Sequence, residues 1–259
     1  MSIISLLNVG MVFVEYCYDF YRTILWSKAS PFCPKEKRLY YDIVLLAHTV
    51  EKGLSVKTPR PKFGKAKIMS MLSMLDEYSF GWPLFPVEKS YGCLNAYLAW
   101  HIDRNIELDS EIKSKIQSYL DRCKRENITR KGGVKVISGS AHFDSAKDLL
   151  GGRYSSRQFL PEVVSNEKLE LIASLVRRTP SQCNRQSARI HFYSDKNQID
   201  ELLRLQGGAE GFREDVYNLF VISSEISAWS GYKARSQAYV DGSLMAMQVL
   251  NACHIAKLG

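Results

Sequence analysis

Two short polar stretches of the 259-residue sequence carry side chains that could bind an anion. In the first, Arg153, Ser155 and Arg157 occupy alternate positions. On an extended backbone, alternate side chains point to the same side of the chain. Guanidinium groups suit a phosphate or the edge of an electron-rich heterocycle, so the stretch indicates an anion site. For such a triplet on its own, a solvated strand edge is the alternative.

The second stretch follows about one helix later. Pro180 breaks the helical pattern, and Ser181, Asn184 and Gln186 come after it. These polar side chains can bond the carbonyl and N–H groups of a ligand. Capping of the turn is an equally weighted alternative for each of them, because Ser and Asn often bond their own backbone. Together the two stretches would suit a phosphorylated heterocycle.

The first half of the chain shows helical periodicity throughout. Apolar residues at helical spacing begin with Leu39 and end with Leu54, where Gly53 closes the pattern. The predicted helices cover residues 36–54, 66–78, 88–105 and 110–126. The segment 132–140 is rich in Gly, Ser and β-branched residues, and it predicts a domain boundary.

The second half alternates between helix and strand. The predicted elements are a helix over 166–177, a strand over 188–193, a helix over 196–205, a strand over 216–223 and a helix over 234–256. The segment 242–256 is small or apolar almost all round. A helix of this kind must be covered by protein on both faces.

The order of these motifs resembles the nitroreductase family of FMN-dependent oxidoreductases from about Ser145 to the end of the chain. The pattern R-x-S-x-R-x-F, a helix, P-S-x-x-N-x-Q, a strand and a small-residue helix follow one another. The resemblance implies an α+β fold, with an all-helical N-terminal extension over 1–135 and an FMN-binding domain over 136–259. The run from His48 to Ser55 also resembles the helical extension of a branch often associated with polysaccharide biosynthesis clusters.

The resemblance also implies which residues contact FMN. Arg153 and Ser155 would meet its phosphate and ribityl side, and Arg157 the pyrimidine edge. A cation there would raise the reduction potential, because reduced flavin carries negative charge at that edge. Arg213 lies in the segment from which relatives reach the flavin ring. The full predicted cofactor-binding set is Arg153, Tyr154, Ser155, Arg157, Ser181, Asn184, Gln186 and Arg213.

The implied activity is electron transfer from NAD(P)H through flavin N5 to an unknown small-molecule acceptor. The implied assembly is a homodimer with FMN at the subunit interface and the last helix at its centre. No side chain stands out as an acid or base. Relatives continue past Gly259 with a segment that supplies an N–H to N5, so we expect a truncated chain or a weakened flavin site. A catalytically weak or inactive scaffold that keeps the fold is therefore the alternative.

Charge and cysteine content bear on partners and compartment. The formal charge of +8 favours anionic ligands, and no nucleic-acid motif accompanies it, so no nucleic-acid partner is expected. Six scattered cysteines and no secretory leader predict reduced thiols and a cytoplasmic location. Residues 1–14 are uncharged, but the run is shorter than the roughly 20 residues of a spanning helix. They predict an amphipathic helix that docks on protein, with membrane-surface contact as the minority alternative.

Other candidate sites are weaker. His48 and Glu51 stand three residues apart on a helix without a second His, which favours a surface or core-edge pair over a metal site. No metal is therefore predicted. The sequence also lacks the nucleophile-elbow, Walker and dinucleotide-binding motifs. At the start of the last helix, Gln237 and Asp241 could approach the flavin, but an N-terminal helix cap is the role we expect for Asp241.

Overall fold

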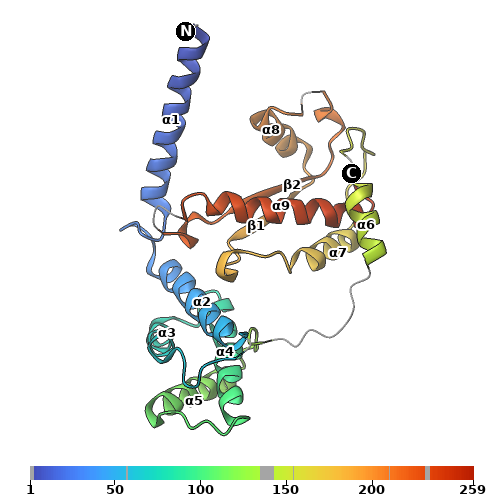
Figure 1. Ribbon diagram of the computed structural model, residues 1–259. Coiled ribbons are helices and arrows are strands. Elements are labelled where there is room, and N and C mark those ends of the chain that lie inside the picture. Colours follow the sequence, from blue (N-terminus) through green and yellow to red (C-terminus); the bar gives the residue numbers. More distant parts are fainter. Residues whose placement is uncertain (1–2, 57, 135–142, 154, 210, 231–233) are drawn as a thin grey trace. The chain divides into compact units, whose positions relative to one another are not determined.

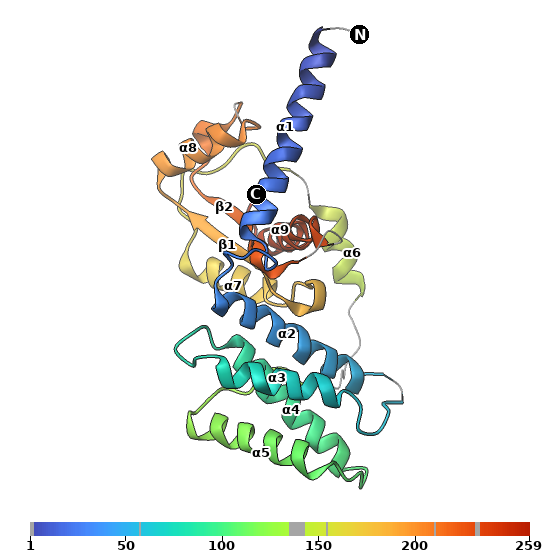
Figure 2. The ribbon, with the colours of Figure 1, turned by 90° about the vertical axis from the view of Figure 1, so that its left-hand side faces the viewer.

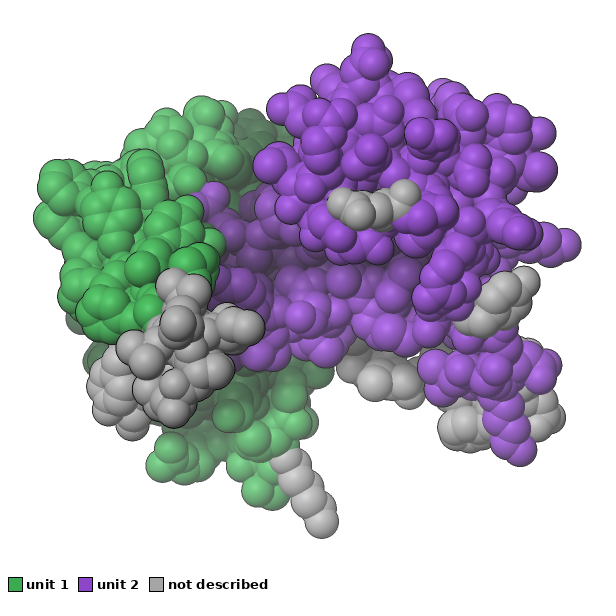
Figure 3. Space-filling view, turned by 90° about the horizontal axis from the view of Figure 1, so that it is seen from above, with its two compact units in different colours: residues 1–138, 183–185, 226–235 green, residues 139–182, 186–225, 236–259 purple. Residues whose placement is uncertain are grey.

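The chain divides into two units, each with its own core. The computed structural model describes residues 3–56, 58–134, 143–153, 155–209, 211–230 and 234–259 (Figure 1). Unit 1 comprises Met1–Ser138, Cys183–Arg185 and Ile226–Arg235, and unit 2 comprises Gly139–Gln182, Gln186–Glu225 and Ser236–Gly259 (Figure 3). The boundary predicted between residues 135 and 136 falls in the segment 135–142, outside the described residues.

Unit 1 is helical over its long N-terminal segment. Its helices are α1 (Ile3–Trp26), α2 (Lys35–Leu54), α3 (Lys65–Glu77), α4 (Phe85–Ile102) and α5 (Ser110–Arg125), and the short 3-10 helix η3 (Ile226–Ala228) also belongs to it. Helix α2 packs against α3 and α4, and α5 against the same two helices (Figure 2). The all-helical N-terminal region that the sequence predicts is confirmed.

The apolar faces of α2 to α5 make one core. From α2 the fully buried side chains include Ile43, Ala47 and Val50, which recur every three or four residues. Ile112 and Ile116 of α5 repeat the same spacing. Helix α4 begins and ends three residues earlier than predicted. At its end Asp103 forms the C-cap, and the left-handed φ of 53° at Asn105 prevents further helical turns.

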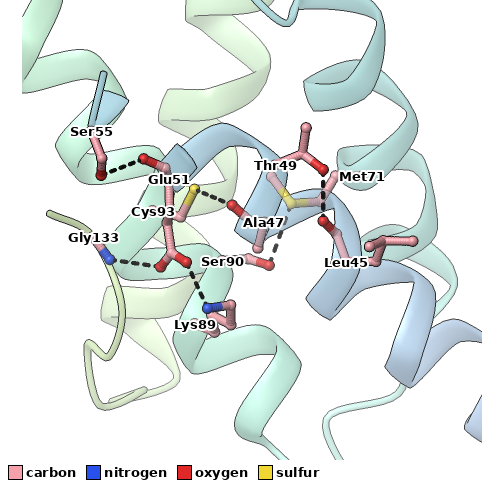
Figure 4. Close-up of polar contacts among 10 residues, drawn as sticks. All are labelled: Leu45, Ala47, Thr49, Glu51, Ser55, Met71, Lys89, Ser90, Cys93 and Gly133. Atoms are coloured by element: carbon pink, nitrogen blue, oxygen red, sulfur yellow. Dashed lines mark hydrogen bonds and ion pairs between the residues drawn. The ribbon is translucent and has the colours of Figure 1, made fainter. Parts of the chain in front are cut away.

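A buried ion pair lies in the core of unit 1 (Figure 4). Lys89 of α4, with only 2% of its side chain exposed, donates from Nζ to Oε2 of Glu51 at 2.7 Å. The second oxygen of Glu51 accepts the backbone N–H of Gly133 at 3.0 Å. Glu51 therefore pairs with Lys89, and His48 is half-buried on the same helix. The expectation of a surface or core-edge pair for His48 and Glu51 stays a prediction.

Unit 2 combines helices with a two-stranded antiparallel sheet. Its elements are α6 (Phe143–Gly152), α7 (Asn166–Val176), β1 (Ala188–Tyr193), α8 (Lys196–Gln206), the 3-10 helix η2 (Arg213–Asp215), β2 (Leu219–Ser224) and α9 (Gln237–Ile255). The strand register runs from Ala188 opposite Ser224 to Tyr193 opposite Leu219. The α+β fold class is confirmed.

One helical layer covers the two-stranded sheet of unit 2. Helices α7 and α9 pack on each other, and α9 also lies along both strands (Figure 1). Val249 and Cys253 of α9 are buried with Ile172 and Val176 of α7, against Ile222 of β2. A second cluster holds α8, where Ile199 and Leu203 pack against Ala209 and Val216.

Three predictions for unit 2 need correction, namely one missed helix and the first residues of two elements. Helix α6 was not predicted, because its ten residues lie beside the segment taken as a boundary. Strand β2 begins at Leu219, since the N–H of Val216 still bonds the carbonyl of Arg213 in η2. Helix α9 begins at Gln237, after Ser236.

Helix α1 carries large apolar side chains that are exposed. Phe13, Phe20 and Trp26 each have more than 60% of their surface exposed. Docking of this helix on a partner or a membrane surface stays a prediction. Within the described residues, no helix has the length and apolar character needed to cross a membrane.

Gly92 of α4 tests the packing of unit 1. A methyl group at Gly92 would overlap the carbonyl oxygen of Lys131, whose N–H bonds the carbonyl of Glu88. In an open helix, Gly→Ala stabilises by about 1 kcal/mol. Here we expect Gly92→Ala to destabilise the protein by about 1 to 3 kcal/mol through overpacking. Urea unfolding measures this, with Gly10→Ala as control, because nothing lies within 4 Å of that position. Equal or greater stability of Gly92→Ala would show that the loop at Lys131 is loosely held.

Candidate functional site

The turn between α7 and β1 has an unusual backbone. Cys183, Asn184 and Gln186 all have left-handed φ angles, of 53°, 52° and 52°. Residues other than Gly rarely adopt these backbone angles, and each one in this conformation lowers the stability of the fold by on the order of 1 to 3 kcal/mol. Strained residues of this kind persist only where the surroundings hold them, and they cluster at binding and catalytic sites. The turn that the sequence singles out is therefore a candidate ligand-binding turn.

Two side chains of unit 2, those of Asp241 and Ser181, hold the flanks of this turn. The backbone N–H of Gln182 donates to the carboxylate of Asp241, at 3.1 Å to the nearer oxygen. The side-chain amide of Gln237 donates to the same carboxylate at 2.8 Å. The hydroxyl oxygen of Ser181 accepts the backbone N–H of Gln186 at 2.9 Å. The strained backbone is thus stabilised by charge-assisted and neutral hydrogen bonds.

The role predicted for Asp241 is wrong. Asp241 is the fifth residue of α9, and its side chain is 2% exposed, so it does not cap the helix. Ser236 occupies the N-cap position without a side-chain cap bond. Asp241 instead reaches across to Gln182, 59 positions earlier in the sequence. Local helix-start rules could not reveal this contact, because it depends on the tertiary packing of α9.

The turn-capping alternative is seen for Ser181. Its oxygen is used by the turn, although the hydroxyl proton can still be donated to a ligand. Asn184 is half-buried in the three-residue segment that belongs to unit 1, and Gln186 is exposed. Ser187 is fully buried, and its hydroxyl shares a hydrogen bond of 3.1 Å with the hydroxyl of Ser224.

The first polar stretch follows α6 without regular secondary structure. Arg153 is half-buried and lines a cavity of about 790 Å³ in unit 2. Ser155 and Arg157 are exposed, and Tyr154 lies outside the described residues. Although Arg153, Ser155 and Arg157 alternate along the sequence, they differ in burial, and only Arg153 of the three is partly enclosed by protein.

The cavity is mostly apolar, with basic side chains in its wall. Arg153 is joined there by two further basic side chains. They are His254, in the last turn of α9, and Lys257, two residues after the helix ends. The apolar part includes Phe159 and Phe212, from the second cluster of unit 2. The volume lies within the range of small-molecule sites, and cations beside apolar walls suit an amphipathic anion.

Sequence reasoning missed His254 and Lys257 as site residues. The signal that could have found them is their spacing of three residues at a helix end. Helix α6 contacts α9, and a methyl group at Gly152 would lie 3.4 Å from Nε2 of His254. This contact brings the imidazole to the residue next to Arg153.

The remaining predicted residues do not join this cavity. Among the described members of the predicted set, Arg153 is the one that lines it. Ser181 and Gln186 belong to the strained turn. Arg213 is half-buried in η2, and its carbonyl accepts a hydrogen bond from Nζ of Lys196 at 3.0 Å. The predicted residues are thus divided between the cavity of unit 2 and the turn, whose residues Cys183–Arg185 belong to unit 1.

Fold and site together define an α+β protein with a strained polar turn and a cavity that has basic walls. The model of the nitroreductase family matches residues 150–210, which include both polar motifs. The resemblance to that family is therefore confirmed over this segment. No curated protein matches the chain.

The residues present fit a phosphorylated, aromatic cofactor in their chemistry. Arg153 and Lys257 can neutralise a phosphate, and aromatic side chains such as Phe159 can contact a planar ring. Exposed Arg157 leaves a second guanidinium accessible. Among the described residues, no group of three or more His, Cys, Asp or Glu side chains could hold a metal ion.

Removing the carboxylate of Asp241 should release the turn. Asp241→Ala would leave the N–H of Gln182 and the amide of Gln237 without this acceptor, and we expect a loss of about 1 to 3 kcal/mol in unfolding free energy. Hydrogen exchange at the Gln182 amide should accelerate more than exchange in β1. Gln237→Ala is the control, because it removes one donor and keeps the backbone bond. Unchanged protection of Gln182 in Asp241→Ala would show that the turn is held by other contacts.

Proposed function

We propose that the chain is an FMN-dependent oxidoreductase that passes electrons from NAD(P)H to a small-molecule acceptor. The observation that carries the proposal is the nitroreductase match over 150–210, the segment that holds both polar motifs. The strained turn and the basic cavity support a bound ligand in the same segment. The six cysteines are all free, which supports the cytoplasmic location that we propose with it.

The protein residues would bind and orient the cofactor. Arg153, with Ser155, would hold the phosphate, and Arg157 would stabilise negative charge at the pyrimidine edge. The strained turn would present Asn184 and Gln186 as polar contacts, with Tyr154 and Arg213 as further members of the predicted set. Bound FMN would supply the redox chemistry, taking a hydride from NAD(P)H at N5 and giving the electrons to the acceptor. The protein would mainly position the cofactor and tune its potential.

A homodimer through α9 belongs to the same proposal. One face of α9 is buried in unit 2, while Val240, Leu244 and Met247 are each more than 40% exposed. Their spacings of four and three residues place these side chains along one stripe of the helix. Large exposed apolar stripes on soluble units mark interaction surfaces. A second copy of α9 would cover this stripe and bring two subunits together.

A scaffold without redox activity is the second candidate. It is favoured by the separation of the predicted residues between the cavity and the turn, since Arg153 lines the cavity and Ser181 does not. Such a protein would keep the fold and bind FMN weakly or not at all. The visible absorption spectrum of the purified protein separates the two functions, because bound oxidised FMN absorbs blue light.

The function is tested by FMN binding and turnover. We expect the protein to bind FMN, to quench its fluorescence and to oxidise NADH or NADPH. Arg153→Ala should weaken FMN binding roughly tenfold to a hundredfold, because one charge-assisted contact is lost. Arg178→Ala is the matched control, since Arg178 is exposed after α7 and lies outside the cavity lining. Absence of FMN binding by the unsubstituted protein would favour the scaffold, and equal loss in both variants would remove Arg153 from the site.

The dimer is tested on the exposed stripe of α9. Leu244→Glu and Met247→Glu should weaken dimerisation on the order of a hundredfold, because each would bury a carboxylate without a partner. Leu205→Glu, on α8 with 82% exposure, is the matched control and should leave the dimer intact. Sedimentation velocity over a range of concentrations measures the effect. A folded monomer at all concentrations of the unsubstituted chain would contradict the proposed interface.

A further inference from the structure

A second group of basic side chains belongs to unit 1. It centres on His48, which is half-buried on α2. Lys52 follows His48 by one helical turn on α2, so the two side chains lie on the same face. Arg185 reaches unit 1 through the segment Cys183–Arg185. These residues are not part of the proposed cofactor-binding set.

The base of this group is rigid. The buried ion pair of Lys89 and Glu51 stands beside His48 on the α2–α4 interface, as Figure 4 shows for the pair itself. Both carboxylate oxygens of Glu51 are already engaged, one by Lys89 and the other by the N–H of Gly133. Glu51 is therefore committed to the protein, and it is not an available ligand for a metal or for an incoming cation.

Arg185 of this group packs against the indole ring of Trp229. The guanidinium of Arg185 lies over the ring of Trp229 at 4.9 Å from its centroid. Trp229 is 3% exposed, and its carbonyl accepts the N–H of Lys28 at 2.9 Å. The helix η3 just before it contacts α2. Nε1 of Trp229 is buried and has no hydrogen-bond partner within the described residues, although buried donors are normally satisfied.

The electrostatic field at His48 is positive. Burial lowers the pKa of His48, and the charges of Lys89, Lys52 and Arg185 lower it further, while Glu51 alone raises it. These four charged groups carry three positive charges and one negative charge. His48 is therefore a neutral imidazole near pH 7, with a net positive field around it. An anion at this place would meet favourable charge and could receive a proton at His48.

We propose that His48, Lys52, Arg185 and Trp229 form a binding site for the phosphoryl group of a small phosphate monoester. A dianion matches the net charge of the four groups around His48 better than a carboxylate does. The guanidinium, the ammonium and the indole N–H are all donors, as phosphoryl oxygens require. The site belongs to unit 1 and would operate whether or not unit 2 binds FMN.

Sulfate is the first probe, because it stays a dianion throughout the range in which His48 titrates. The Cε1 proton of His48 can be followed by NMR and assigned with His48→Gln. Sulfate should raise the pKa of His48, since bound anion stabilises the imidazolium. By linkage, sulfate should then bind more tightly as pH falls through that pKa, by about tenfold for each unit of upward shift. An unshifted His48 at saturating sulfate would overturn the proposal.

Variants separate this site from general attraction by a basic protein. Lys52→Met and Arg185→Met should each weaken binding of inorganic phosphate about tenfold, measured by calorimetry at fixed ionic strength. Lys113→Met is the matched control, because it removes one exposed cation of unit 1 from α5. Lys52 is also exposed, so its replacement leaves the core intact and keeps the test valid if Arg185→Met folds poorly. Equal weakening by Lys113→Met would mean an adventitious ion only.

FMN titration of the same variants distinguishes this proposal from the proposed function. Lys52→Met should bind FMN as the unsubstituted protein does, while its phosphate affinity falls. If Lys52→Met lost FMN and phosphate affinity together, the group would be part of the cofactor site and the proposal of a separate site would be wrong. If the protein binds no FMN and yet shows the His48 shift, the proposed function fails and the phosphoryl site stands.

Discussion

The buried carboxylate of Asp241 is the contact on which the candidate site of unit 2 depends. A left-handed backbone at three residues other than Gly is unfavourable by itself, so something outside the turn must stabilise it. Asp241 does so from within α9, by accepting the N–H of Gln182 immediately before the strained residues. The position of Asp241 is set in turn by the packing of α9 on α7 and on strands β1 and β2. The geometry of the turn is thus a consequence of the core of unit 2.

Much of the fold follows from periodicity, since the sequence pattern predicted helices α2 to α5 to within a few residues, whereas α1 continues to Trp26, well past the uncharged run 1–14. Strand β1 was predicted with its observed bounds, because Ala188–Tyr193 alternates and is preceded by a turn. Helix α6 was missed because it is only ten residues long and follows the Gly-rich segment that was taken as a boundary. Asp241 was misjudged for a different reason, since its partner is 59 positions away. Local rules predict elements well and say little about contacts of this range.

The same distinction applies to the site residues. The sequence indicated two polar motifs correctly as a family signature, and the match over 150–210 confirms that signature. It did not predict that Arg153 would line a cavity with His254 and Lys257, about a hundred residues later in the chain. Spacing shows which side chains share an element, whereas a cavity gathers side chains from several elements. The group around His48 was hidden in the same way, because Arg185 joins unit 1 from outside the N-terminal helices.

Helix α9 combines three demands that explain its sequence. Val249 and Cys253 pack in the core of unit 2, Asp241 holds the turn, and Leu244 and Met247 are exposed on another face. A helix that met only the first demand would be amphipathic, with polar residues on its outer face. The apolar outer face is therefore not explained by the core of unit 2 or by the turn. In the homodimer that we propose, a second copy would cover this face, and the single helix would then both hold the turn and form the interface.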